Sequence, residues 1–481
     1  MSNNINRRDF LKIFGGATIA SSALLTTACK GKATQETTVS DQEPPKDKMT
    51  MRRNPNSGDN VSILGYGMMR LPTLPKKEET DPDEIDQEMV NKQVDYALEH
   101  GVNYFDTSPA YCQGKSESAT GTALKRHDRK KFYVATKLSN FAPQTWTREG
   151  SQEMFRQSME YLQVDYIDYL LLHAIGGTSR NMEGKDLNSL ETFNARYMDN
   201  GILDWLVEQK KAGKIRNLGF SYHGDIAIFD LLLKWHDEGK YHWDFVQIEL
   251  NYLEWEFADE INKRNTDAKY LYGELKKRGI PAVIMEPLLG GRLANVPDPI
   301  VEKMKEKRPQ DTVASWAFRF AGTPDGVLTV LSGMTYMEHL KENIRTYAPL
   351  TPITKEENDF LMDVAKKIYD LKTIPCNECN YCMPCPYGIN IPAIFHHYNQ
   401  IIKEGKMPRK NESEEYAKLR RDFLIGYDRS VPKLRQADHC IGCGECVSHC
   451  PQRINIPREM EKMDAFIENL KRDGLVADKR V

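Results

Sequence analysis

From residue 61 onward, short apolar runs alternate with longer amphipathic stretches. In the longer stretches apolar residues recur every three to four positions, which indicates helices, whereas the short runs indicate strands. About eight such units follow one another within about 290 residues, which predicts a (β/α)8 TIM barrel. The predicted strands are 62–67, 104–106, 132–135, 167–172, 217–220, 246–249, 282–285 and 326–331. The predicted helices are 85–99, 117–125, 148–162, 202–212, 226–235, 270–277, 312–320 and 337–345.

A doubly wound open sheet is the alternative arrangement of the same units. Its dinucleotide fingerprint, Gly-x-Gly-x-x-Gly, should follow the first strand. Here Gly65-Tyr-Gly67 continues as Met-Met-Arg70, so the third glycine is missing and the barrel is favoured.

Polar residues end three of the predicted strands. Asp106 ends one, with Tyr111 in the loop after it, and Lys137 and His173 end the next two. All strand carboxyl ends in a parallel barrel face one rim, where active sites are built. Asp106, Tyr111, Lys137 and His173 are therefore the candidate catalytic residues.

This combination suits proton transfer to a carbonyl. A Tyr hydroxyl, with an ordinary pKa near ~10, is a weak acid at neutral pH. We expect Lys137 to lower the pKa of Tyr111, Asp106 to hold Lys137 charged, and neutral His173 to orient the carbonyl oxygen. Such a donor fits hydride delivery by a cofactor.

Cysteine usage separates the C-terminal part of the chain from the barrel. Eight of the 10 cysteines lie in two runs, and only Cys29 and Cys112 are outside them. Repeated C-x-x-C units favour a metal or cluster over disulfides, and structural zinc is the alternative to a cluster. The net charge of −3 gives no sign of a nucleic-acid partner.

The N-terminal residues combine a basic head with a short, weakly apolar stretch. This pattern predicts an export signal in residues 1–29 and not a membrane-spanning helix. Arg7-Arg8-Asp-Phe-Leu-Lys resembles a twin-arginine (Tat) signal. Thr27-Ala28-Cys29 is similar to a lipoprotein processing box, so both lipid attachment at Cys29 and simple cleavage stay open. Residues 30–58 read as a polar linker.

Residues 63–343 resemble the aldo-keto reductases. The resemblance rests on the Asp/Tyr/Lys/His set and on Leu64-Gly-Tyr-Gly-Met-Met-Arg-Leu-Pro, Leu218-Gly-Phe-Ser, Gln247, Glu286-Pro-Leu-Leu-Gly-Gly, Ser332-Gly-Met and Glu342-Asn. It implies that Tyr111 is the general acid/base. It also implies nicotinamide contacts by Ser221 and Gln247, and a nucleotide site lined by Leu288, Gly290, Ser332, Gly333, Glu342 and Asn343.

Three positions differ from the family pattern. Tyr222 follows Ser221 where many relatives have Asn, and Met285 replaces an aromatic platform for the nicotinamide ring. His339 stands where NADP-specific members often carry Arg, so the cofactor is expected to be NADP or NAD.

The second cysteine run has the C-x-x-C-x-x-C-x-x-x-C-P spacing of bacterial ferredoxins. The first is one residue shorter in its last gap. Together they resemble a two-cluster ferredoxin, which implies two [4Fe-4S] clusters in a small, mainly α-helical domain over residues 351–481, after a barrel over residues 59–350. One cluster would bind Cys376, Cys379, Cys382 and Cys450, and the other Cys440, Cys443, Cys446 and Cys385.

Three functions remain open. In the first, the chain is a nicotinamide-dependent carbonyl/alcohol oxidoreductase whose clusters exchange electrons with a redox partner protein. In the second, it is an electron-transfer or binding subunit with a non-catalytic barrel, and in the third it is a reductase whose clusters are structural. The intact catalytic set favours the first and third. The sequence shows no flavin signature and does not identify the substrate. The predicted location is periplasmic or lipid-anchored at the cell envelope, with membrane contact only through Cys29.

Overall fold

The computed structural model describes residues 43–75, 83–261, 265–371, 373–409, 414–450, 452 and 454–477. The predicted signal, with Cys29, and the first part of the predicted linker lie outside the described residues. No helix among the described residues is long and apolar enough to cross a membrane.

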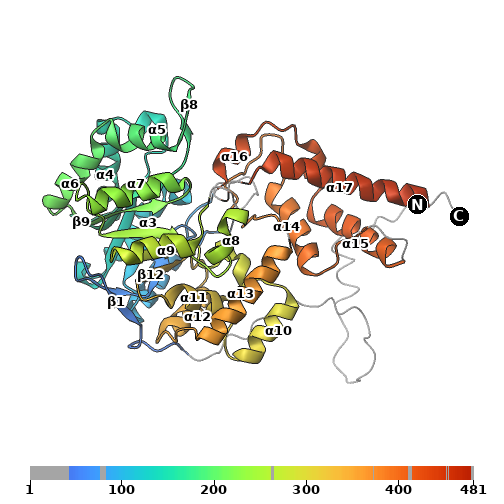
Figure 1. Ribbon diagram of the computed structural model, residues 1–481, viewed down its shortest axis with the longest axis horizontal. Coiled ribbons are helices and arrows are strands. Elements are labelled where there is room, and N and C mark those ends of the chain that lie inside the picture. The colour runs from blue at the N-terminus through green and yellow to red at the C-terminus, as the bar shows by residue number, and fades with distance from the viewer. Residues whose placement is uncertain are drawn as a thin grey trace, which may run out of the picture. The chain divides into compact units, whose positions relative to one another are not determined.

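Eight parallel strands form a closed barrel, which confirms the predicted (β/α)8 fold (Figure 1). Each strand pairs with its neighbours in chain order, and the last pairs with the first. The strands are β3 (Leu64–Gly67), β4 (Tyr104–Asp106), β5 (Tyr133–Leu138), β6 (Ile167–Ile175), β9 (Ile215–Tyr222), β10 (Phe245–Glu249), β11 (Ala282–Met285) and β12 (Val327–Ser332).

A helix follows each barrel strand and covers its outer face. These helices are α2 (Gln87–Glu99), α3 (Ser116–Leu124), α4 (Arg148–Leu162), α6 (Ile202–Lys211), α7 (Ile226–Asp237), α9 (Ala268–Lys277), α11 (Val313–Gly322) and α12 (Met337–Tyr347). The helices α8 (Glu254–Ile261) and α10 (Asp298–Lys307) are additions on the loops after β10 and β11. The large apolar core lies between the strands and these helices.

A smaller apolar cluster fills the inside of the barrel and includes Tyr104, Ala135, Tyr169, Leu171 and Phe245. Successive side chains of a strand point to opposite faces, so the residue two positions further along each strand also faces inward. The inward-facing side chains are therefore apolar in the middle of the barrel and polar at the carboxyl ends of the strands.

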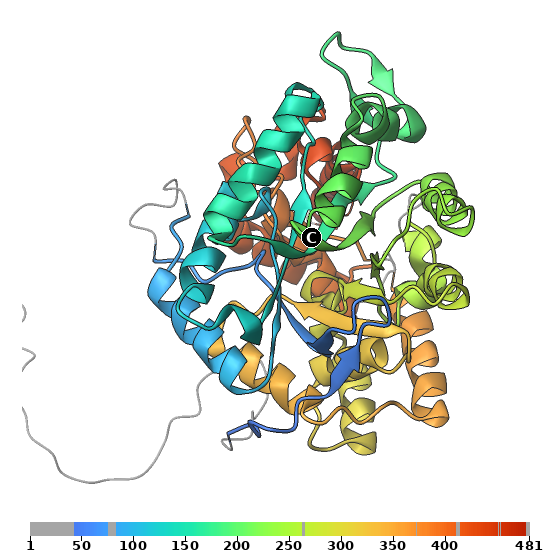
Figure 2. The ribbon, with the colours of Figure 1, turned by 90° about the vertical axis from the view of Figure 1, so that its left-hand side faces the viewer.

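An antiparallel hairpin of β1 (Met51–Arg53) and β2 (Asn60–Ser62) lies in front of the barrel strands in Figure 2, where it is dark blue. Asn54 from the hairpin donates to the Tyr169 hydroxyl at 3.3 Å, and Tyr169 donates to Asp59 at 3.0 Å. β1 falls inside residues 30–58, which the sequence placed in the linker. Its three residues carry no apolar alternation and are ordered by pairing with β2.

The C-terminal domain is mainly helical and has a core of its own. Its helices are α14 (Ile391–Lys403), α15 (Glu414–Ser430), α16 (Glu445–His449) and α17 (Ile456–Ala477). Helix α13 (Lys355–Asp370), which the sequence assigned to this domain, packs instead into the barrel core through Leu361, Val364 and Ala365. The amphipathic α13 has its apolar partners on the barrel, and the helical domain therefore begins after it.

Candidate functional site

Alternation along three adjacent strands places the predicted catalytic side chains in the barrel mouth. Asp106 lies two residues beyond Tyr104, Lys137 two beyond Ala135, and His173 two beyond Leu171, and the earlier residue of each pair belongs to the interior cluster. Tyr111 opens the short helix η1 (Tyr111–Gly114) in the loop after β4. The structure thus brings all four residues together.

A buried ion pair organises this group. Lys137 Nζ donates to Asp106 Oδ1 at 2.6 Å and to the Thr107 carbonyl at 2.8 Å. The same Nζ lies 4.7 Å from the centre of the Tyr111 ring, a cation–π distance. The Tyr111 and His173 rings meet edge to face, with centroids 6.0 Å apart.

The lowered pKa expected for the Tyr111 hydroxyl is not found. Burial raises the pKa of the Tyr111 hydroxyl well above its ordinary value, and Asp106 and Glu286 raise it further. Both hydrogen bonds of Lys137 go to Asp106 and Thr107, so its ammonium group contacts the Tyr111 ring face instead of the hydroxyl oxygen. Tyr111 is therefore held in its protonated, donating form.

The expected neutral state of His173 agrees with the structure. Burial lowers the pKa of His173 well below its ordinary value, and the nearby Lys137 charge lowers it further. Ser139 Oγ lies 2.6 Å from His173 Nδ1, and Ser108 Oγ lies 3.4 Å from it. The sequence analysis missed both serines. The signal for Ser139 was its position two residues after Lys137 on the same strand path.

Residues 174–200, after His173, form a folded excursion on the rim. They contain the β7 (Ser179–Arg180) and β8 (Asp186–Leu187) hairpin and the helix α5 (Ser189–Phe193). The buried Arg196 that follows donates to the His173 carbonyl at 2.7 Å and to Asn140 Oδ1 at 3.1 Å. The excursion therefore fixes the backbone at His173.

The residues expected at the nicotinamide lie on neighbouring strands. Ser221 and Gln247 are paired in register across β9 and β10. Gln247 Oε1 is buried and has no hydrogen-bond partner among the described residues, while its Nε2 donates to Met285 Sδ at 3.3 Å. A carboxamide N–H would satisfy this free acceptor, so the site fits a nicotinamide.

The other expected nucleotide residues fall into two groups. Ser332 ends β12 and accepts a 3.0 Å bond from Asn343 Nδ2 on α12, with Gly333 next in the chain. Glu342, on the same helix, accepts from Thr312. Leu288 and Gly290 lie after β11, at the short helix η5 (Leu289–Ala294).

Gly290 lies against the C-terminal domain. A Cβ atom built on Gly290 would come within 2.1 Å of Cβ of Asn377, a residue of the first cysteine run. Close by, Arg292 Nη2 donates to Thr373 Oγ1 at 3.1 Å. The first cysteine run is therefore docked on the rim loop that the family resemblance assigns to the nucleotide.

The cysteine thiols form two groups. The pKa of Cys382 is raised to about 12 by burial, and Cys376, Cys379 and Cys450 raise it further. The pKa of Cys446 is raised to about 11 by burial, with added effects of Cys443, Cys385 and Cys440. These two groups are the same sets that the ferredoxin resemblance implies.

No group of three or more potential ligands among the described residues is close enough to hold a single metal ion. The ligands of a four-iron cluster stand farther apart than those of one ion, because each thiolate binds a different iron. The backbone N–H of Glu378 donates to Cys376 Sγ at 3.4 Å, a contact that stabilises a thiolate. Two sets of four thiols fit two clusters by donor chemistry.

Cys112 belongs to neither thiol group. Its Sγ donates to the Met69 carbonyl at 3.3 Å, and burial raises the pKa of its thiol. It follows Tyr111 in the chain and is a neutral thiol packed against the barrel core.

Comparison with known proteins agrees with this geometry. The aldo/keto reductase family matches residues 63–364, and a 4Fe-4S dicluster domain matches residues 375–454. The chain belongs to the aldo/keto reductase family. It is an oxidoreductase of that family joined to a 4Fe-4S dicluster domain.

Individual relatives cover the barrel. "Uncharacterized oxidoreductase YqkF" of Bacillus subtilis is 26% identical over 342 residues, 66% of this chain and 97% of the relative. L-galactose dehydrogenase of Arabidopsis thaliana is 24% identical over 328 residues, 64% of this chain and 92% of the relative. The solved structure of aldo-keto reductase AKR11C1 from Bacillus halodurans (holo form) aligns with 66% of this chain and 96% of its own, with 24% identity and a TM-score of 0.48.

The thiol grouping predicts which of the two clusters is lost when one cysteine is replaced. Cys450→Ser should release the cluster held with Cys376, Cys379 and Cys382, so iron should fall to about half of the wild-type content, because Ser is a poor cluster ligand. Iron analysis with EPR of the reduced protein measures this. Cys112→Ser is the matched control and should keep all its iron. Zinc in place of iron, or an unchanged iron content in Cys450→Ser, would contradict the assignment.

Proposed function

We propose that the protein interconverts a carbonyl and an alcohol with NADP or NAD as the hydride carrier and Tyr111 as general acid/base. The observation that carries this proposal is the buried Lys137–Asp106 pair, which lies beside a protonated Tyr111 and a neutral His173 in the barrel mouth. The unpartnered Gln247 Oε1 supports the nicotinamide assignment.

Each residue has a separate task in this mechanism. A nicotinamide held by Ser221 and Gln247 would supply a hydride to the carbonyl carbon, or accept one from the alcohol carbon in the reverse direction. The Tyr111 hydroxyl gives its proton to the carbonyl oxygen in reduction, and its raised pKa keeps that proton available at neutral pH. His173, as a neutral imidazole, holds the carbonyl oxygen toward Tyr111.

Lys137 acts when Tyr111 loses its proton. The resulting phenolate carries a negative charge in a buried site, which is unfavourable without a nearby cation. The Lys137 ammonium, 4.7 Å from the ring centre, supplies that charge, and Asp106 holds it in place.

We further propose that the dicluster domain holds two [4Fe-4S] clusters on the two thiol groups, where they supply single-electron transfer. The contact of Asn377 with Gly290 supports electron exchange between the first cluster and the active rim. Structural clusters are the competing role, because six of the eight run cysteines pack against the apolar core of the helical domain.

Export by the twin-arginine route is part of the proposal and rests on the sequence around Arg7 and Arg8. Clusters are assembled in the cytoplasm, and this route carries folded proteins, so a protein loaded with clusters could use it. The proposed location is the periplasm, or the envelope surface with a lipid at Cys29, where a small carbonyl or alcohol substrate and a redox partner protein would meet it.

Replacing the proton donor tests the catalytic assignment. Tyr111→Phe should lower kcat by about 10²- to 10⁴-fold, the usual contribution of a general acid, and leave nucleotide affinity unchanged. Steady-state kinetics and fluorescence titration with NADPH measure the two effects. Tyr161→Phe, which removes the hydroxyl of an exposed tyrosine on α4, should behave as wild type. Full turnover in Tyr111→Phe would refute the role of Tyr111.

Anaerobic reduction separates the two roles of the clusters. Clusters that exchange electrons with the barrel should lose visible absorbance when NADPH is added, or when the alcohol substrate is added together with NADP, because the two electrons of one hydride would reduce the two clusters by one electron each. Dithionite, which reduces clusters directly, provides the full-reduction reference. Clusters that respond only to dithionite would be structural.

The export signal is tested by a change that keeps its charge. The double substitution Arg7→Lys and Arg8→Lys should retain the cluster-loaded protein in the cytoplasmic fraction, because twin-arginine transport depends on the guanidinium pair. Cell fractionation with immunodetection measures this. Lys12→Arg is the control and should reach the envelope. Normal export of the double variant would contradict the twin-arginine assignment.

A further inference from the structure

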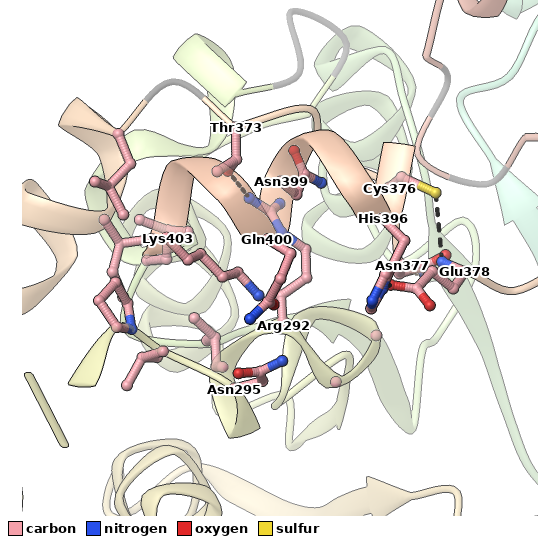
Figure 3. A pocket seen from close by; sticks show the side chains of 18 of the residues that line it. Arg292, Asn295, Thr373, Cys376, Asn377, Glu378, His396, Asn399, Gln400 and Lys403 are labelled. Atoms are coloured by element: carbon pink, nitrogen blue, oxygen red, sulfur yellow. Dashed lines mark hydrogen bonds and ion pairs between the residues drawn. The ribbon is translucent and has the colours of Figure 1, made fainter. Parts of the chain in front are cut away.

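Two arginines of the barrel and one cysteine of the first run line the same cavity. This cavity has a volume of about 260 Å³ and lies between the loop after β11 and helix α14. Arg70 and Arg292 come from the barrel, and Cys376 comes from the C-terminal region (Figure 3). The structure therefore places positive charge from the barrel next to a proposed ligand of the first cluster.

Arg292 reaches the chain just before the first cysteine run. Its Nη2 donates to Thr373 Oγ1 at 3.1 Å, and Figure 3 shows the side chain extending from the barrel loop to that hydroxyl. Its Nη1 is buried and has no hydrogen-bond partner among the described residues. A buried guanidinium nitrogen without a partner is unfavourable, so an anion close to this side chain would stabilise it.

The thiolate of Cys376 provides negative charge near Arg292. Burial lowers the pKa of Arg292, and the charges of Glu254 and Cys376 oppose that shift. Burial also raises the pKa of Glu254 well above its ordinary value, so this carboxyl group contributes less negative charge. Cysteines that bind an iron–sulfur cluster are thiolates, and the proposed first cluster is therefore the anion that best matches Arg292.

Arg70 acts on a second ligand of the same cluster. Burial raises the pKa of the Cys379 thiol, whereas the backbone N–H of Tyr381 and the charge of Arg70 lower it. Glu286 opposes the effect of Arg70, but burial raises the pKa of Glu286 and so reduces its negative charge. Both barrel arginines thus influence cysteines of the first thiol group.

The carboxylate on the cysteine run itself is offset by its own neighbours. His396 Nδ1 lies 2.8 Å from Glu378 Oε1. The hydrogen bond with His396 lowers the pKa of Glu378, and the charge of Lys403 lowers it further. His396 and Lys403 both belong to helix α14, so the C-terminal domain supplies the partners of Glu378 and leaves the charge of Arg292 to the cluster.

A cation beside a cluster favours the reduced state of that cluster. A [4Fe-4S] cluster on four thiolates is an anion, and its reduction adds one electron, and so one negative charge, without forming or breaking a bond. A nearby positive charge stabilises the more negative of the two states. Charge close to the ligands is accordingly one of the factors that set a cluster potential.

We propose that Arg292, together with Arg70, raises the reduction potential of the first cluster, so that the barrel sets how readily the cluster beside its rim accepts an electron. This inference rests on the proposed function, because it requires a cluster on the first thiol group. Arg292 acts here through its charge and takes no part in proton transfer at Tyr111.

A redox titration of the full-length, cluster-loaded protein tests the proposal. Dithionite reduces the protein stepwise in the presence of mediators, and EPR follows each reduced cluster. In Arg292→Gln the ratio of reduced to oxidised first cluster at a fixed potential should fall about ten-fold, which is a potential lower by about 59 mV for a one-electron couple. The second cluster should keep its potential and is the internal control. Cys450→Ser, which should lose the first cluster, identifies the signal of each.

Matched variants separate charge from structure. Arg292→Lys keeps the charge and should keep most of the potential. Thr373→Val removes the hydrogen bond of Arg292 but not its charge, so the potential should stay near that of the wild type. Arg156→Gln removes an exposed charge on α4, where Arg156 is paired with Glu153, and should change neither cluster.

A second variant covers the event that Arg292→Gln does not fold. Arg70→Gln leaves the bond between Arg292 and Thr373 in place and should lower the same potential. An unchanged potential of the first cluster in both Gln variants, or an equal loss in Arg292→Lys and Arg292→Gln, would overturn the proposal. A wild-type protein without iron would refute the cluster assignment itself, so the two failures are distinguishable.

Discussion

The ion pair between Lys137 and Asp106 lies inside the barrel with side chains 0% and 3% exposed, and the active rim is arranged around it. Two opposite charges so far from water persist only with close contact and additional hydrogen bonds. The Thr107 carbonyl accepts one such bond from Lys137, while Asp106 Oδ2 has no hydrogen-bond partner among the described residues. The pair places a positive charge on the face of the Tyr111 ring, and the Lys137 charge adds to the burial that lowers the pKa of His173. Lys137 therefore links Asp106, Tyr111 and His173, the other three residues of the candidate site.

The dicluster domain is built against that rim and not apart from it. Asn377 reaches Gly290 closely enough that no side chain could replace the glycine hydrogen, and Arg292 reaches Thr373. The loop after β11 thus belongs to the barrel rim and also contacts the first cysteine run.

Regular spacing made most of the fold predictable. Strand alternation and helical periodicity are local properties, so the barrel units and the inward direction of Asp106, Lys137 and His173 could be predicted from residue spacing. The two cysteine runs are likewise a local pattern. Strand β1 and helix α13 were misplaced because their assignment depends on what they pack against. Met51–Arg53 has no apolar pattern of its own. The amphipathic pattern of α13 predicts a helix with one buried face, but it does not show which of the two cores that face contacts.

The sequence by itself determined the barrel, the four catalytic candidates and the two cysteine runs, because each of them depends only on residue type and on spacing along the chain. Tertiary structure alone decided the protonation states. Burial raises the pKa of Tyr111, where the sequence suggested that Lys137 would lower it, and burial depends on long-range packing that residue spacing does not show. It also decided that the cysteine run meets Gly290 and that Arg292 and Lys403 share a cavity, because contacts between residues about 90 to 110 positions apart leave no periodic signal.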